Sequence, residues 1–382
     1  MINILYIHQS ADLYGSDKTL LFLVTNLDKN IFNPIVVLPK KGPLVEALLD
    51  KNIKVIITPV LKLHRKMFTL KYLTSLPFEI KKSIKHILKE TQGIKINIVQ
   101  SNTLAVLLGV FLSRKLKAKH IWHVHEIIVH PKFISNLYPK ILNQYSDIVI
   151  CNSKATRDNL LIRNHKLANK LKVIYNGLDS SEFNSIQNLK LKEKFQYNTN
   201  DLVITLVGRI NRLKGHLLLL KVFDKYFKDK ENLKILFVGS PVLGQENYLE
   251  EVNNKIIESK LESKVKILPF HKDLSEIWNI TDIAVVPSTE AESFGLVALE
   301  AMFSKKPVIG TNLGGLKEII IDNETGFLFD NKDEIAFKNA IEKLISDPLL
   351  RNKFGENGYE RAISNFSIDK YIGQFADLYK RL

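Results

Sequence analysis

Residues 283–302, IAVVPSTEAESFGLVALEAM, contain three successive kinds of sequence. Ile283–Val286 is a continuous apolar run, short enough to be a strand that is buried on both faces. A polar loop follows, and from Gly295 onward the sequence is rich in Ala and Leu, as in a helix. A helix that begins directly after a strand presents unpaired amides and the positive end of its dipole. The turn between them therefore predicts a site for an anion.

Two carboxylates, Glu292 and Glu300, bracket this turn. Taken singly, each is also compatible with a solvated surface side chain, and we expect the nearby Glu290 to face solvent. Carboxylates beside an anion site favour a ligand that has both a phosphate and hydroxyl groups, because a carboxylate accepts hydrogen bonds from hydroxyls.

Short apolar runs alternate with amphipathic helices along the rest of the chain, which predicts parallel sheets with helical crossovers. The fold class is therefore α/β, with two doubly wound, Rossmann-like domains. We expect an N-terminal domain over residues 1–185, a C-terminal domain over 186–364, and a helix in 365–382 that packs back on the N-terminal domain. A helix over 71–90 is expected to break at Pro77. The expected strands are 2–8, 35–38, 55–58, 96–100, 120–124 and 147–151, then 202–207, 234–238, 265–268, 283–286 and 307–310.

Bulk properties are those of a folded protein with more than one core, since 382 residues exceed what one core usually holds. The single cysteine, Cys151, excludes an internal disulfide framework and suits a reducing compartment. No apolar run reaches the roughly 18 residues of a membrane span, and the first ten residues do not read as a signal peptide. We expect a cytoplasmic location.

The net charge of +15 lies entirely in the first half, because residues 1–185 hold 27 Lys and Arg against 12 Asp and Glu. Such a surface suits nucleic acid, an anionic membrane or an anionic substrate, or is simply a soluble lysine-rich face. The segment 79–90, EIKKSIKHILKE, places isoleucines on one helical face and lysines off it. It is either an ordinary solvated helix or a peripheral contact with the inner face of the membrane. Aromatic residues do not interleave with the basic ones, so nucleic acid is not an expected partner.

A second loop with phosphate-binding chemistry is residues 208–215, GRINRLKG, directly after the expected strand 202–207. Arg209 offers a planar fork and Lys214 a point charge for phosphate oxygens. The same residues are also compatible with an ordinary loop that binds no ligand.

Two further strand ends in the N-terminal domain carry candidate residues. After strand 2–8, Gly15 lets the backbone approach a ligand, and Ser16 is equally suited to capping a helix. After strand 120–124, His123 and His125 point the same way by strand alternation, with Glu126 next to them. A third ligand with sensible spacing does not follow, so no metal is expected.

These motifs resemble those of the retaining glycosyltransferases of family 4, which have the GT-B fold. The Glu-x7-Glu spacing of Glu292 and Glu300, with Phe-Gly after the first and Ala-Met after the second, resembles the signature of that family. The loop 208–215 resembles its Gly-Arg-x4-Lys-Gly element. The chain departs from the family pattern at 14–17, where Tyr-Gly-Ser-Asp replaces Gly-Gly-x-Glu, and at Pro269 and Phe270, where a Gly is usual.

The resemblance implies a retaining, metal-independent glycosyltransferase without a cofactor. It would move a sugar from a UDP- or GDP-sugar to a glycan or lipid-linked acceptor in cell-surface polysaccharide synthesis, with its site in the cleft between the domains. The alternatives are a sugar-nucleotide epimerase of the same architecture, a glycoside hydrolase, and a non-catalytic basic binding protein. The implied roles are catalysis for His125 and Glu292, leaving-group stabilisation for Arg209 and Lys214, ribose binding for Glu300, and donor contacts for Gly15, Phe294, Gly295 and Leu296.

Overall fold

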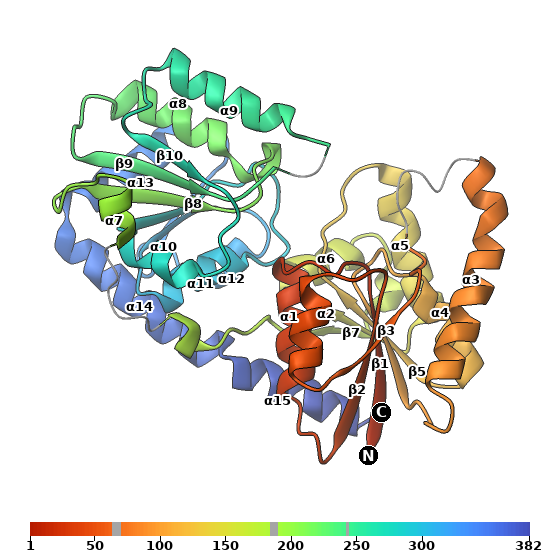
Figure 1. Ribbon diagram of the computed structural model, residues 1–382. Helices are drawn as coiled ribbons and strands as arrows, with labels where there is room; N and C mark the ends of the chain where they lie inside the picture. The colour runs from red at the N-terminus through yellow and green to blue at the C-terminus, as the bar shows by residue number, and fades with distance from the viewer. Residues whose placement is uncertain (63–69, 184–189, 242–243) are drawn as a thin grey trace. The chain divides into compact units, whose positions relative to one another are not determined.

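The computed structural model describes residues 1–62, 70–183, 190–241 and 244–382. The chain forms two compact units (Figure 1): unit 1 comprises Met1–Gly177 and Ile368–Leu382, and unit 2 comprises Leu178–Ser367. Leu178 belongs to unit 2 because its amide donates to the carbonyl oxygen of Phe366 at 3.0 Å. The sequence-based boundaries at 185/186 and 364/365 therefore lie instead at 177/178 and 367/368.

Unit 1 is built on a seven-stranded parallel sheet with the order β3-β2-β1-β4-β5-β6-β7. The strands that the apolar runs predicted are all present, and the additional strand β7 completes the sheet. Strand bounds are β1 Ile2–His8, β2 Phe32–Leu38, β3 Lys54–Ile57, β4 Ile98–Asn102, β5 Lys119–Val124, β6 Ile148–Cys151 and β7 Leu171–Val173.

Helices cover both faces of this sheet (Figure 1). The core on one face includes side chains of α1, α2 and α15, whereas α3, α4, α5 and α6 contribute to the cores on the other. The bounds are α1 Gly15–Asn26, α2 Pro43–Asp50, α3 Leu70–Glu90, α4 Leu108–Leu116, α5 Lys132–Tyr145, α6 Lys154–Leu161, the short helix η2 His165–Leu167, and α15 Ile368–Lys380.

Helix α3 runs through Pro77 without interruption, so the expected break at that residue is wrong. Proline removes one backbone hydrogen bond from a helix, but α3 is also held by burial of its apolar face. Ile87 is fully buried in the core, and Ile80 and Ile84 pack against the same core. Tertiary packing therefore outweighs the local cost of the proline.

Helix α15 is an integral part of unit 1. Its side chains Tyr371, Phe375 and Tyr379 are buried against the sheet. The Tyr6 hydroxyl donates to the Tyr379 hydroxyl at 3.1 Å, which in turn donates to Gln100 Oε1 at 2.7 Å. A polar chain inside an apolar core stays favourable only when it is bonded in this way.

Unit 2 is built on a six-stranded parallel sheet with the order β10-β9-β8-β11-β12-β13. The expected strands 202–207, 265–268 and 283–286 match the structure residue for residue, whereas β13 was not expected. Strand bounds are β8 Leu202–Val207, β9 Leu233–Val238, β10 Val265–Leu268, β11 Ile283–Val286, β12 Val308–Thr311 and β13 Gly326–Phe329.

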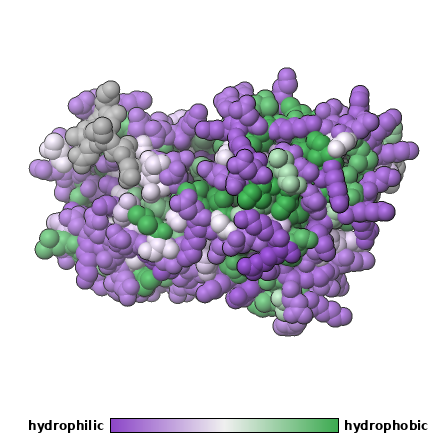
Figure 2. Space-filling model, turned by 90° about the horizontal axis from the view of Figure 1, so that it is seen from below, coloured by the Kyte–Doolittle hydropathy of each residue, from purple (hydrophilic) through white to green (hydrophobic). Residues whose placement is uncertain are grey.

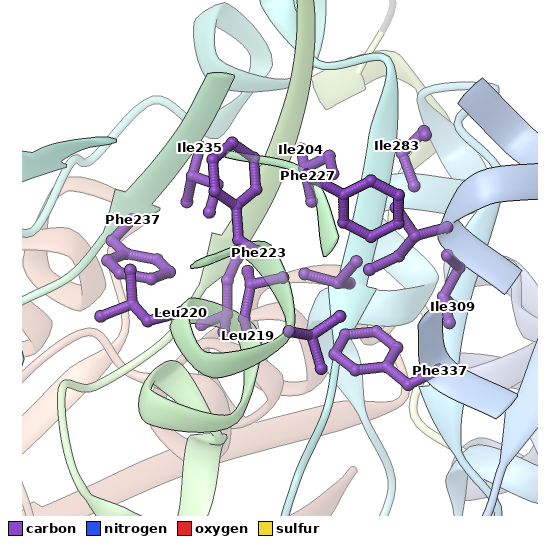
Figure 3. Close-up of a cluster of buried hydrophobic side chains, with 14 of the residues drawn as sticks. Ile204, Leu219, Leu220, Phe223, Phe227, Ile235, Phe237, Ile283, Ile309 and Phe337 are labelled. Carbon is purple, nitrogen blue, oxygen red and sulfur yellow. The ribbon is translucent and has the colours of Figure 1, made fainter. Parts of the chain in front are cut away.

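The main core of unit 2 lies between the sheet and helices α8, α9 and α13. Figure 3 shows Phe223 of α8, Phe227 directly after α8 and Phe337 of α13 packed against strand isoleucines such as Ile204 and Ile309. The helices are η3 Ser180–Phe183, α7 Lys190–Lys194, η4 Arg212–Lys214, α8 His216–Tyr226, α9 Asn247–Glu258, α10 Leu274–Ile280, α11 Leu296–Phe303, α12 Leu316–Ile319, α13 Glu334–Ser346 and α14 Pro348–Phe366.

Each sheet has one point at which its strand order reverses. In unit 1 the reversal lies between β1 and β4, and in unit 2 between β8 and β11. Connections leave these two strands in opposite directions, and doubly wound proteins bind their ligands beyond the carboxyl ends of such strands. The candidate residues are therefore to be sought after β1 and β4 and after β8 and β11.

Candidate active site

The loop after β8, residues 208–215, lies against the end of β11. Gly215 has φ of 78°, a left-handed conformation that favours glycine. A Cβ at this position would also collide with the carbonyl oxygen of Pro287. The loop can approach β11 this closely only with glycine here, and this approach brings Lys214 to the loop that follows β11.

Lys214 and Glu292 form an ion pair, with Lys214 Nζ 2.5 Å from Glu292 Oε1. The Ser288 hydroxyl donates to the same carboxylate oxygen at 2.6 Å. Burial alone would raise the pKa of Glu292, but the Lys214 charge and the two hydrogen bonds outweigh it and hold the pKa below its usual 4.5. The carboxylate is thus ionised at neutral pH. Of the sequence-predicted residues, these two are brought into direct contact.

Gly314 and Gly315 hold the Glu292 loop from the other side. The Gly315 amide donates to the Glu292 carbonyl oxygen at 2.7 Å. Gly314 has φ of 58°, and a Cβ there would collide with that same carbonyl oxygen. The backbone of Glu292 is therefore supported by a loop in which no side chain fits.

With Glu292 as the predicted catalytic group, replacing Gly314 with Ala is expected to lower kcat about 100-fold, because a displacement of about 1 Å costs this much. The added methyl group must push the Glu292 backbone away. The matched control is Gly93→Ala, since Gly93 also has a positive φ, 80°, but has open space around its Cβ position. Steady-state kinetics on both variants checks this. Equal activities would show that the backbone contact does not position Glu292.

The remaining predicted residues of unit 2 lie on the same two loops and on α11. Arg209 is exposed directly after β8, and Glu290 is exposed, as expected. Gly295 is the N-cap of α11, so the turn does open a helix. Phe294 and Glu300 are buried, the latter with 5% of its surface exposed.

In unit 1 the site begins with a residue that the sequence reasoning missed, His8. It is buried at the end of β1, and its Nε2 lies 2.5 Å from Asp17 Oδ1. The other oxygen of Asp17 accepts from the Tyr14 amide at 2.9 Å. Helix α1 begins at Gly15, so the alternative assignment of Ser16 as its N-cap is wrong. Instead, the Asp17 carboxylate accepts a hydrogen bond from the Tyr14 amide, directly before the helix.

His125 lies next to His123, with ring centroids 3.9 Å apart, as the strand alternation predicted. Its Nε2 lies 3.2 Å from Asn102 Oδ1 at the end of β4, a second residue missed from sequence. Burial holds the pKa of His125 well below 6.5, so the ring is neutral at pH 7.

Glu126 has an orienting role for the backbone around His125. Its Oε2 accepts from the amide of Leu104 at 3.0 Å and from the amide of His125 at 3.1 Å. Burial raises the pKa of Glu126, although these hydrogen bonds act in the opposite direction. The carboxylate thus ties the segment after β4 to the segment after β5.

His8, Asn102 and Ser288 had one weak signal in common, since His8 and Asn102 are the last residues of their strands and Ser288 lies two residues beyond β11.

Among the described residues, no group of three His, Cys, Asp or Glu side chains is placed to hold a metal ion. In that same part of the chain, the helices are all too short or too polar to cross a membrane. Hydrophilic residues cover most of the face in Figure 2, with hydrophobic patches between them.

The two sheets and their loops define a two-domain α/β protein with a polar, charged site at the carboxyl edge of each sheet. The chain belongs to the group 1 glycosyltransferases of the GT-B fold. Residues 187–361 match the model for glycosyl transferases group 1, and residues 15–182 match the model for glycosyltransferase family 4.

Among curated relatives, the chain is 32% identical over 240 residues to the capsular polysaccharide biosynthesis glycosyltransferase CapM of Staphylococcus aureus, a match covering 62% of each chain. It is 28% identical over 242 residues to the D-inositol 3-phosphate glycosyltransferase of Corynebacterium kroppenstedtii, covering 62% of this chain and 53% of that one. The matches thus span between about half and two thirds of these relatives.

Solved structures show the same fold over the full length. Anabaena Alr3699/HepE in complex with UDP and glucose has a TM-score of 0.86, with 24% identity and 100% of both chains covered. A glycosyltransferase from Rickettsia africae has a TM-score of 0.85, with 24% identity, 100% of this chain and 98% of that chain covered.

Proposed function

We propose that this protein transfers a sugar, with retention of configuration, from a nucleotide-diphospho-sugar to a glycan or lipid-linked acceptor in polysaccharide synthesis. The observation that carries the proposal is the group formed by Lys214, Glu292 and Ser288 beside Arg209. These residues lie at the strand-order reversal of unit 2, where a doubly wound sheet receives its ligand.

Departure of a nucleoside diphosphate leaves negative charge on the bridging oxygen, which has to be stabilised in the transition state. Arg209 and Lys214 supply two cations after β8, and the amides of Phe294, Gly295 and Leu296 lie at the start of α11. With two cations at hand, the leaving group does not require a metal ion. Glu292 is placed beside Lys214 and would accept hydroxyls of the transferred sugar, while Glu300 would accept the ribose hydroxyls.

A uridine diphospho-sugar has stronger support as the donor than a guanosine diphospho-sugar. HepE has been solved with UDP-glucose, at a TM-score of 0.86 and 23% identity to this chain. The relation to CapM, a capsular polysaccharide biosynthesis glycosyltransferase, supports a role in surface polysaccharide synthesis.

A thermal-shift screen of UDP-glucose, UDP-N-acetylglucosamine and GDP-mannose tests the donor assignment. A donor present at 100 times its Kd stabilises the folded state by about 2.7 kcal/mol, so the correct one is expected to raise the melting temperature measurably. Arg209→Ala is expected to abolish the shift. The screen is followed by incubation of the bound donor with and without acceptor glycans. Binding without any transfer, or epimerisation of the donor alone, would contradict the proposed function.

The acceptor side of the proposal involves a membrane. Helix α3 exposes Lys81, Lys82, Lys85 and Lys89 on the face opposite its buried isoleucines. Helix α4 packs beside α3. On these two helices, Phe78 is 73% and Phe111 43% exposed. Each lysine near an anionic leaflet contributes about 1 kcal/mol, and Phe side chains are typical of the apolar face of basic interfacial helices. We propose that unit 1 binds an anionic membrane surface, where a lipid-linked acceptor would be presented.

Liposome flotation tests this membrane contact. The wild-type protein is expected to float with vesicles that contain anionic lipid and to remain unbound with zwitterionic vesicles. Changing the four α3 lysines to Gln is expected to abolish flotation, whereas changing four exposed lysines of unit 2, namely Lys228, Lys260, Lys332 and Lys353, is expected to leave it intact. Equal flotation of the two variants would refute a contact through α3.

A further inference from the structure

A row of buried polar side chains crosses three neighbouring strands of unit 1. His8 pairs in register with Asn102 on β4, and Asn102 pairs with His123 on β5. Register partners point to the same face of a sheet, and this face carries α1 and α15. All three side chains are almost completely buried. Burying polar groups is unfavourable unless they are hydrogen-bonded. His8 and Asn102 are bonded to each other, whereas neither ring nitrogen of His123 has a hydrogen-bond partner within the described part of the chain.

The donors and acceptors in the row are determined one after another, starting from Asp17. An ionised carboxylate can only accept, so His8 Nε2, 2.5 Å from Asp17 Oδ1, carries the proton. His8 Nδ1 lies 3.0 Å from Asn102 Nδ2 and 3.4 Å from the backbone oxygen of Asn102. In the shorter contact the amide nitrogen is the donor, so His8 Nδ1 is the acceptor.

The orientation of the Asn102 amide then determines the state of His125. With Nδ2 directed to His8, the amide oxygen is directed to His125, 3.2 Å from its Nε2. An amide oxygen can only accept, so Nε2 of His125 carries the proton. In a neutral imidazole the other nitrogen, Nδ1, is then left with a lone pair.

We propose that Asp17, His8 and Asn102 are positioning residues that fix His125 in the tautomer protonated at Nε2 and leave its Nδ1 as an acceptor. In the proposed transfer reaction, on which this role rests, an acceptor-only Nδ1 receives a hydrogen bond from a substrate hydroxyl and holds it in one orientation. The low pKa of His125 supports this arrangement, since a protonated ring has no lone pair. Asp17 thereby acts through His8 rather than on the ligand.

The tautomer is measured directly by long-range ¹H–¹⁵N NMR of the imidazole nitrogens in the full-length protein, with His125 assigned from the signals lost in His125→Gln. The wild type is expected to show His125 protonated at Nε2. Asn102→Leu removes the acceptor and is expected to shift the His125 signals towards a mixture of both tautomers. Asn102→Asp keeps an acceptor opposite Nε2 and is expected to keep Nε2 protonated. The control Asn26→Leu, at an exposed position on α1, is expected to change nothing.

Two results would overturn the proposal: a wild-type His125 protonated at Nδ1, or His125 signals that do not change in a folded Asn102→Leu variant. The kinetic prediction is a kcat about 10- to 100-fold lower in Asn102→Leu, the size found for outer partners of metal-bound His. The donor KM should be unchanged. The NMR result is independent of sugar transfer, so a failure of the proposed function would be recognised separately.

Discussion

Replacing Lys214 with Ala is expected to lower kcat about 100- to 1,000-fold, the loss found when one preorganised electrostatic contact to a transition state is removed. Two effects act together. In the proposed reaction the variant lacks a cation for the leaving diphosphate, and the Glu292 carboxylate loses the charge that holds its pKa below 4.5. Burial, which disfavours the ionised form, is then no longer offset by the Lys214 charge, so the pKa of Glu292 is expected to rise.

The matched control for this variant is Lys221→Ala. Lys221 also forms an ion pair, with Glu334, but its side chain is 63% exposed on α8. Exposed pairs of this kind contribute little, so full activity is expected. Steady-state kinetics over a pH series checks both variants. Activity in Lys214→Ala equal to that of the control would show that the ammonium of Lys214 does not act in turnover.

Replacing Phe375 with Ala is expected to lower the free energy of unfolding of unit 1 by about 3–5 kcal/mol, the usual loss for a buried Phe. The side chain is fully buried in the core that joins α15 to the sheet. Its ring centroid lies 5.1 Å from that of Tyr371, 5.6 Å from that of Tyr379 and 5.2 Å from that of His123. The cavity would therefore open beside the histidines as well as beneath the helix.

Urea unfolding followed by circular dichroism measures this loss. Phe78→Ala serves as the control, because Phe78 is 73% exposed and its removal leaves no cavity. A loss of less than about 1 kcal/mol in Phe375→Ala would mean that α15 contributes little to the stability of unit 1. A reduced kcat in the same variant, at temperatures where it is fully folded, is expected from the contact with His123.

Most strands were predictable because their signal is local. A run such as Ile283–Val286 is apolar at every position, and such a run suits a strand covered on both faces. The missed strand β13 has only four residues and begins with a glycine, so neither its length nor its composition distinguishes it from a loop. At Pro77 the local signal gave a wrong expectation. A proline disfavours a helix locally, but α3 is stabilised by packing against a core whose other residues are distant in sequence.

The candidate site was predictable where its residues form contiguous motifs. Arg209 and Lys214 share one loop after a strand, and Glu292 and Glu300 share the next such turn. His8 and Asn102 carry no motif, since each is a single polar residue at the end of an apolar run. The contact between His8 and Asn102 becomes visible only in the folded structure, where β1 and β4 are neighbours, because 94 residues separate the two side chains in sequence.

The sequence by itself determined the two doubly wound domains and identified the loops that carry the candidate site residues, because periodicity and loop composition are properties of short segments. The tertiary structure alone decided which groups meet. It pairs Lys214 with Glu292 across 78 residues, links Asp17 through His8 and Asn102 to His125, and places α15 in unit 1. Strand order decides these partnerships: the reversal of order brings the carboxyl ends of distant strands side by side, and no short segment encodes it.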